Sequence, residues 1–317
     1  MHRDILGIPV AATRLLPLMI ALSDLPTLLR EARTSCLHRM SGSVAAQETV
    51  DLGGVAQQLD RTNPWLGYRH IPDGVLRAWQ AVESAFGSSV LSEHLRLLLL
   101  HFIGQFDLRF ASAALPAPFA RQFDEAMQRI VRQCLDGTLD VSPSNDVYLK
   151  DLGVVRLRLV PCVSHLLYLH SGVPRRVLFR HPSLLGPVLR MGGVRPVVEN
   201  HVHPLMLDHF NEEGRERCYE LIGELLRERG ELRGLMGASW YYDPHLGRVT
   251  PRLAYLHDVP ARNGASVVPA EREGADSGAL ARSAHRRALY ETGKYQPHNY
   301  LMLWPRDDIL HYLSSRN

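Results

Sequence analysis

Lysine is almost absent from this chain. Lys150 and Lys294 are the only lysines among 36 basic residues, which leaves 34 arginines. The guanidinium group of arginine is a planar fork of donors that binds carboxylate or phosphate in pairs, so we expect cationic contacts of that kind. Because 33 acidic residues reduce the net charge to +3, the composition excludes a protein that coats nucleic acid through an excess of positive charge.

Cysteine is also scarce. The four cysteines, Cys36, Cys134, Cys162 and Cys218, lie far apart, and none belongs to a CxxC motif. This spacing excludes a disulfide-stapled miniprotein and a cysteine-based metal site. We expect buried, reduced thiols and therefore a protein of the cytoplasm.

Long hydrophobic runs are missing. The longest uncharged run near the N-terminus, Leu15–Ser23, contains Pro17 and is too short to cross a bilayer. No small-residue cleavage site typical of a signal peptide follows it. The apolar run Leu97–Leu100 continues to Ile103 and then meets Asp107, which is typical of a buried helix. We therefore expect no membrane partner.

Several motifs of nucleotide binding and covalent catalysis are absent as well. No GxGxxG follows a predicted strand, and the chain contains neither GxxxxGK(S/T) nor GxSxG. These absences exclude dinucleotide and P-loop chemistry and disfavour a serine acyl-enzyme.

Residues 1–145 are predicted to be mainly helical. Hydrophobic residues recur at three and four positions in the clearest helix, Pro118–Leu135, and Gly137 follows its end. The other helices are predicted at Leu15–Leu22, Leu25–Arg33, Gly74–Phe86 and Glu93–Phe102, and residues 40–64 are predicted to be a loop because of their glycines and Asn63-Pro64.

Residues 146–317 are predicted to form a second region with a mixed sheet. Strands are expected at Val155–Leu159, Val163–His170, Leu235–Tyr242, Arg252–Val259 and Tyr300–Trp304. Helices are expected after Asn211, at Ala279–Tyr290 and at Asp307–Leu313, with long connections at 181–204 and 261–277. The fold class is therefore α+β, a helical N-terminal region followed by a mixed sheet with flanking helices.

Histidines and carboxylates gather in the segment 199–209. It holds Glu199, His201, His203, Asp208 and His209. On an extended strand His201 and His203 point to the same face, because side chains alternate. These two imidazoles with Asp208 or His209 are a ligand set suited to zinc or to a non-haem iron with open positions. An exposed loop that carries histidines by chance explains the same pattern.

Three aromatic residues in a row, Trp240, Tyr241 and Tyr242, precede Asp243 at a predicted strand end. They suit the wall of a cleft that stacks on a flat or acyl substrate, with Asp243 as a base beside it. Ordinary core packing followed by an Asp-Pro turn is the alternative.

Arginines follow in the predicted helix 279–290. Arg282 and Arg286 are four residues apart and share a helical face, and Arg287 adjoins them. If Ser283 is instead the N-cap, the pair Arg286-Arg287 falls in the first helical turn. Either arrangement can hold a phosphate or carboxylate, and a solvated helix face is the alternative.

The C-terminal part resembles the GNAT acyltransferases. The segment Ala288–Tyr295 is similar to the A-x-x-L-Y-x-x-x-G-F pattern that ends the family's last helix, and Tyr300–Trp304 is similar to its final strand. Arg252–Val259 with Pro260–Ala265 looks like the strand that enters the family's pyrophosphate loop. The resemblance implies that Tyr290 protonates the departing thiolate. We expect this tyrosine to project into a groove between diverging neighbours of the sheet, where the strand near 235–242 would splay from the strand near 252–259. It also implies that the loop at Arg262 and Gly264 cradles phosphates.

These observations lead to an acyltransferase hypothesis. We expect transfer from an acyl-coenzyme A to an amine or hydroxyl of a small molecule, with Tyr290 as acid and Asp243 or His257 as base. Trp240, Arg262, Gly264, Arg286 and Arg287 are expected to bind the donor. Because the phosphate-loop signature is incomplete, an aminoacyl-tRNA is a second possible donor.

Two other hypotheses remain open from the sequence. A mononuclear oxygenase or hydrolase would use iron or zinc at His201 and His203. A non-catalytic binding protein would use the aromatic residues and arginines as an interface.

Overall fold

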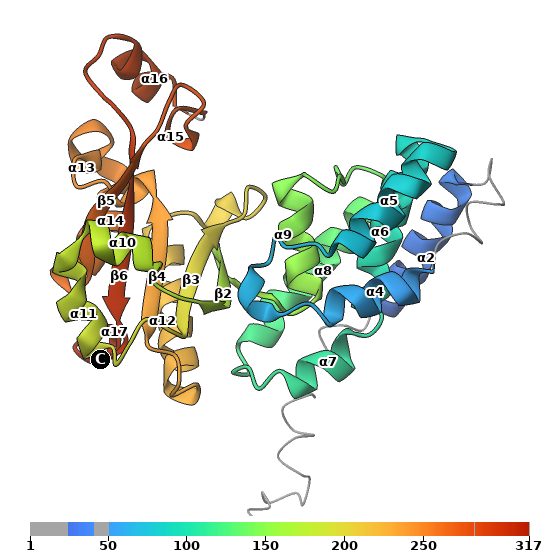
Figure 1. Ribbon diagram of the computed structural model, residues 1–317, viewed down its shortest axis with the longest axis horizontal. Coiled ribbons are helices and arrows are strands. Elements are labelled where there is room, and N and C mark those ends of the chain that lie inside the picture. Colours follow the sequence, from blue (N-terminus) through green and yellow to red (C-terminus); the bar gives the residue numbers. More distant parts are fainter. Residues whose placement is uncertain (1–24, 41–50, 282, 317) are drawn as a thin grey trace, which may run out of the picture. The chain divides into compact units, whose positions relative to one another are not determined.

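The computed structural model describes residues 25–40, 51–281 and 283–316. Contacts within the chain form two compact units, one that ends at Pro161 and one that begins at Cys162 (Figure 1). The fold class is α+β, as predicted. The helix predicted at Leu15–Leu22 lies outside the described residues.

In the described part of the first unit, all regular elements before β1 (Leu159–Cys162) are helices. They are α2 (Leu25–Arg39), α4 (Leu52–Asp60), α5 (Asp73–Phe86), α6 (Ser88–Ile103), α7 (Phe106–Ser112), α8 (Phe119–Leu135) and α9 (Asp146–Val155), with a 3-10 turn η1 at Pro64–Leu66. The helices predicted near 25–33, 74–86, 93–102 and 118–135 are confirmed. The loop predicted over 40–64 is wrong at α4, where the carboxylate of Asp51 caps the helix by accepting from the Gly54 N–H at 2.8 Å.

A buried apolar stripe on α8 organises the core of this unit. Phe123 is fully buried, and its ring lies 5.2 Å from that of Phe106 and 5.6 Å from that of Phe110, both on α7. The apolar run predicted to be a buried helix is α6, in which Leu95 and Phe102 have no exposed surface.

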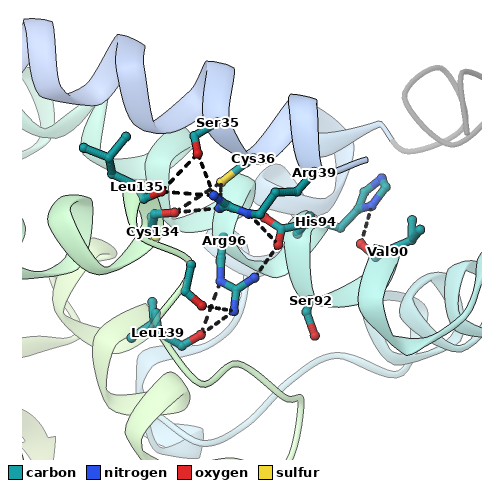
Figure 2. A network of polar contacts seen from close by, with 12 residues as sticks. Ser35, Cys36, Arg39, Val90, Ser92, His94, Arg96, Cys134, Leu135 and Leu139 are labelled. Atoms are coloured by element: carbon teal, nitrogen blue, oxygen red, sulfur yellow. Dashed lines mark hydrogen bonds and ion pairs between the residues drawn. The ribbon is translucent and has the colours of Figure 1, made fainter. Parts of the chain in front are cut away.

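Two arginines close the C-terminal end of α8 (Figure 2). Arg39 of α2 donates to the main-chain oxygens of Cys134 at 2.7 Å and Leu135 at 3.0 Å, which have no partner within the helix. Arg39 also pairs at 2.9 Å with Glu93 of α6, and Arg96 contacts the same buried carboxylate. Two positive charges therefore compensate one buried negative charge.

The second unit is built on a mixed sheet of six strands. They are β1 (Leu159–Cys162), which crosses the boundary between the units, β2 (His165–Ser171), β3 (Val197–Val202), β4 (Gly234–Ser239), β5 (Ser266–Arg272) and β6 (His298–Pro305). Their spatial order is β1-β2-β3-β4-β6-β5 (Figure 1). β3 and β4 are parallel, whereas β2 with β3, β4 with β6 and β5 with β6 are antiparallel.

Helices and short turns connect these strands. The helices are α10 (Arg175–Arg180), α11 (Leu185–Arg190), α12 (Glu212–Glu228), α13 (Leu246–Val249), α14 (Tyr255–Arg262), α15 (Gly278–Ala281), α16 (Ala284–Glu291) and α17 (Arg306–Ser314). The 3-10 turns are η2 (Pro182–Leu184), η3 (Leu207–His209), η4 (Trp240–Tyr242) and η5 (Pro251–Leu253).

Alternate residues of β6 face two different layers of helices. Leu301 and Leu303 belong to one apolar cluster with Val188 of α11. The ring of Trp304 instead lies 5.1 Å from that of Tyr219 on α12. Because side chains alternate along a strand, α11 and α12 cover opposite faces of the sheet.

The strand predicted at Arg252–Val259 is wrong. This segment forms η5 and then α14, whose buried residues Leu256 and Pro260 are four positions apart and therefore share one helical face. The alternation in this segment covers too few residues to distinguish the period of a strand from the period of a helix.

Four other boundaries also differ from the prediction. Val155 ends α9, and only Leu159 of the predicted strand 155–159 lies in a strand. The predicted connections 181–204 and 261–277 contain β3 and β5. The predicted helix Ala279–Tyr290 is two helices, because Ser283 caps α16 by accepting from the Arg286 N–H at 3.2 Å.

The remaining predicted elements of this unit are confirmed. Val163–His170 corresponds to β2, the helix after Asn211 to α12, Tyr300–Trp304 to β6 and Asp307–Leu313 to α17. The strand predicted at Leu235–Tyr242 corresponds to β4 but ends at Ser239. Among the described residues, no helix combines the length and apolar character needed to cross a membrane.

Candidate active site

Strands β3 and β4 pair only at their beginning. Their ladder joins Val198 to Leu235 and Glu199 to Met236, although each strand continues for three more residues. On their outer sides both strands remain paired with β2 and β6 to the end. The two parallel strands therefore diverge after Glu199 and Met236. Their carboxyl ends meet at one edge of the sheet, where open α/β sheets commonly bind ligands.

The side chain of Asn200 bridges the beginning of this divergence. In the amide orientation that satisfies both its oxygen and its nitrogen, it donates to the Met236 main-chain oxygen at 2.9 Å. The side chain thus replaces the ladder hydrogen bond that the diverging backbones no longer make.

Gly237 leaves room for the polar side chains beside it. A Cβ atom at this position would lie 2.2 Å from the side-chain amide of Asn200 and 2.6 Å from the hydroxyl oxygen of Tyr242. The glycine is therefore required by close approach, and it marks the site in the sequence as a glycine within a strand.

A buried arginine, Arg215 of α12, lies behind the divergence. It is 2% exposed and donates to the hydroxyl oxygens of Tyr219 at 2.9 Å and Tyr242 at 3.0 Å. Asn200 accepts from the same guanidinium at 3.2 Å, and His165 of β2 contacts it as well. Within the described residues, no carboxylate forms an ion pair with it, so neutral groups solvate a buried positive charge.

His165 is held in its neutral form by this environment. Burial lowers the pKa of His165 well below 6.5, and the positive charge of Arg215 adds to the effect. Because Arg215 donates to Nε2, the proton lies on Nδ1, which donates to the Ser164 hydroxyl at 2.6 Å.

A second polar cluster adjoins η4, the turn that follows β4. The guanidinium of Arg286 lies 4.8 Å from the ring centre of Trp240 and donates to the Thr250 hydroxyl at 3.2 Å. Arg286 is buried, and this burial lowers the pKa of its side chain, as does the charge of Arg252. The structure thus brings together two of the predicted donor-binding residues, Trp240 and Arg286.

Asp243 ends η4 as a buried carboxylate. It is 2% exposed and accepts from the His245 N–H at 2.8 Å, as in an ordinary Asx turn. Burial raises the pKa of Tyr295 to about 12, and the negative charge of Asp243 contributes. Burial and the same charge raise the pKa of Tyr300. Asp243 therefore lies beside two tyrosines near the start of β6.

Within the described part of the chain, no hydrogen bond or ion pair joins the other predicted catalytic residues to this site. Tyr290 is half-buried in the last turn of α16. His257 lies on α14, and its Nδ1 is 3.1 Å from the carboxylate of Asp258. The groove expected between strands 235–242 and 252–259 does not exist, because the second segment is helical.

The predicted phosphate loop closes a helix instead. The N–H of Ala265 donates to the Pro260 main-chain oxygen at 3.0 Å, and exposed Arg262 pairs with Asp258 at 2.9 Å. Gly264 has φ of +93°, and a Cβ there would lie 2.7 Å from the Asp308 carboxylate. Arg287 is exposed on α16, and its guanidinium donates to Leu280 O at 3.4 Å.

The predicted metal ligands are separated by the end of β3. His201 lies on β3 with Nε2 3.7 Å from the Glu199 carboxylate, whereas His203 follows the strand and accepts from the Leu205 N–H at 3.1 Å. Asp208 and His209 are exposed in η3. Among the described residues, no three histidine, cysteine or acidic side chains are grouped so that they could hold a metal ion.

Sequence reasoning missed Asn200, Arg215 and His165. A signal for Arg215 was available, since it precedes the buried Cys218 and Tyr219 by three and four positions and so falls on the apolar face of α12. The role of Asn200 depends on the parallel pairing of β3 with β4, which no local pattern indicates.

Comparisons of the chain with protein-family models, with curated proteins and with solved structures find no match.

Proposed function

We propose that the protein transfers an acyl group from a coenzyme A thioester or an aminoacyl-tRNA to an amine or hydroxyl of a small molecule, in the manner of the GNAT acyltransferases. The observation that carries this proposal is the divergence of β3 and β4. The sequence predicts a groove between two diverging strands of the C-terminal sheet, and the pair of β3 and β4 takes the place of the predicted pair.

Diverging parallel strands suit an extended donor that contains amides. Beyond Glu199 and Met236 the facing edges of β3 and β4 no longer pair with each other, so their main-chain groups can bind an added chain as a strand would. The pantetheine arm of coenzyme A is such a chain. Ser239, Trp240 and His201 at the mouth are half-buried, while Asn200 and Gly237 at the base are buried.

The buried residues where β3 and β4 begin to diverge can donate a proton to the leaving group. When the acceptor nitrogen or oxygen attacks the acyl carbon, the bond from that carbon to the thioester sulfur or ester oxygen breaks, and the departing atom needs a proton. Tyr242 can supply it, because Arg215 at 3.0 Å would stabilise the resulting phenolate. Main-chain N–H groups of β4 would hold the developing oxyanion.

Asp243 is the proposed base that accepts the proton lost by the acceptor. It follows Tyr242 directly, and Tyr295 and Tyr300 lie close enough for its negative charge to raise their pKa values. His257 is less suited to this role, since it is engaged with Asp258. The four free, buried thiols agree with action in the cytoplasm.

Thermal melting with candidate donors, followed by mass analysis of products, tests the proposal. Saturating acetyl- or longer acyl-coenzyme A, or an aminoacyl-tRNA, is expected to raise the melting temperature, because a ligand stabilises the state that binds it. Incubation with a pool of amines is then expected to yield an acylated product. If no donor of either kind shifts the melting temperature and no product forms, the proposal is wrong.

A further inference from the structure

A long stretch of the chain contains no acidic residue. Between Asp151 and Glu199 there is no aspartate or glutamate. The same stretch contains seven arginines: Arg156, Arg158, Arg175, Arg176, Arg180, Arg190 and Arg195. Its part in the second unit includes α10 and α11, which carry a concentrated basic charge in a chain that is nearly neutral overall.

The inner sides of α10 and α11 pack on the sheet. Val188 of α11 and Leu184 of η2 belong to an apolar cluster with residues of β3, β4, β5 and β6, and Val177 and Leu178 of α10 pack against the same cluster. Most of the other residues of these two helices are exposed.

The outward side of α10 and α11 carries large apolar side chains. Phe179 is 85% exposed, Leu189 is 77% exposed and Leu185 is 49% exposed. Three of the eight large apolar side chains exposed in the described chain thus lie within eleven consecutive residues. Such grouping marks an interaction surface better than scattered exposed residues do.

Exposed arginines lie on the same helix as Phe179. Arg175, Arg176 and Arg180 are exposed on α10, and none of them forms an ion pair with a described residue. Their charge is therefore available to a partner. We call the outward side formed by these three arginines with Phe179, Leu185 and Leu189 the α10–α11 surface.

We propose that the α10–α11 surface binds peripherally to anionic membranes. Exposed apolar side chains together with arginines suit the headgroup region and the acyl region of one leaflet. The apolar side chains can enter the boundary of the acyl chains, and the guanidinium groups can bind lipid phosphates. A nucleic acid would satisfy the arginines but not the leucines, and a second copy of this surface would bring like charges together. The proposal departs from the expectation of no membrane partner, which was drawn from the lack of a run long enough to cross a bilayer, because peripheral binding requires no membrane-spanning helix. It does not depend on the acyltransferase proposal.

Co-sedimentation of the full chain with vesicles tests this inference. We expect binding to phosphatidylcholine vesicles that contain about 30% phosphatidylglycerol and little binding to pure phosphatidylcholine, with binding to the anionic vesicles weakened by salt. The triple variant Arg175→Gln, Arg176→Gln, Arg180→Gln is expected to bind roughly a hundredfold more weakly, at about 1 kcal/mol for each arginine. The double variant Phe179→Ser, Leu189→Ser is expected to lose about tenfold or more.

Matched control variants separate this surface from general effects. Leu108→Ser changes an apolar side chain that is 84% exposed in the first unit, and Arg217→Gln changes an exposed arginine on α12. Both controls should bind vesicles like the unchanged protein. The inference is overturned if anionic vesicles do not bind, if pure phosphatidylcholine binds equally well, or if the patch variants behave like the controls. It is also overturned if the arginine variant loses binding to tRNA while vesicle binding is unchanged, which would indicate a nucleic-acid surface.

Discussion

The side chain of Asn200 donates a hydrogen bond to the main-chain oxygen of Met236, 2.9 Å away on the neighbouring parallel strand. This contact stands where the ladder between β3 and β4 stops. It allows the strands to separate without leaving the Met236 carbonyl unsatisfied in a buried position, which would cost about 1–3 kcal/mol.

Gly237→Ala is expected to destabilise the second unit. The new Cβ would lie 2.2 Å from Asn200 and 2.6 Å from Tyr242, so one of these side chains must move and break its hydrogen bonds. We expect a loss of about 1–3 kcal/mol in the free energy of unfolding, measured by urea denaturation. Gly186→Ala is the matched control, because nothing lies within 4 Å of a Cβ there and alanine favours its helix. Equal stability of the two variants would contradict this account of the divergence.

The acid role in the proposed transfer distinguishes two tyrosines. Tyr242→Phe is expected to lower kcat by roughly 10²–10⁴-fold, because the phenol that faces Arg215 and the divergence is lost. Tyr290→Phe is expected to have a small effect, although the GNAT resemblance implies the acid role for it. Steady-state kinetics with the donor found by thermal melting would measure both. The reverse result would return the acid role to Tyr290 and refute our assignment to Tyr242.

The free energy of unfolding is expected to decrease as the pH is lowered, because of His165. Burial and Arg215 hold its folded-state pKa well below 6.5, so below pH 6.5 the unfolded chain binds a proton that the folded chain does not. The contribution of neutral His165 to the free energy of unfolding is fully present above pH 6.5. It decreases by about 1.4 kcal/mol for each pH unit as the pH is lowered towards the folded-state pKa. Urea denaturation at pH 7.5 and pH 5.5 measures this slope. His165→Gln should make it shallower, and an unchanged slope in that variant would show that other groups cause it.

Glu93→Gln is expected to destabilise the first unit. Glu93 is 6% exposed and compensates both Arg39 and Arg96, so the neutral amide would leave two guanidinium groups without a counter-charge. A loss of about 3 kcal/mol is expected from removal of one partner of a buried pair. Glu83→Gln on the exposed side of α5 is the control and should change the free energy of unfolding by less than about 0.5 kcal/mol. A similar value for both would show that the pair with Arg39 is not stabilising.

The sequence by itself determined the α+β class and the elements with strong local patterns. α8 and α12 carry apolar residues at helical spacing, and β6 is a short apolar run between turn residues, so each was predictable from periodicity and end signals. The failures came where local patterns compete. Arg252–Val259 alternates over a few residues yet packs as a helix through Leu256 and Pro260, and the helix predicted at 279–290 is interrupted by the Ser283 cap.

Only the tertiary structure decided the candidate site. Trp240 and Asp243 were chosen from the sequence because they adjoin a predicted strand end at Tyr242, whereas in the structure the strand ends at Ser239 and Trp240–Tyr242 form a 3-10 turn. The partners Asn200, Arg215 and His165 come from three different elements, and their contacts depend on which strands pair and how far. That information lies in long-range pairing, because a parallel neighbour such as β3 is separated from β4 by a whole helix and leaves no mark in the local spacing of residues.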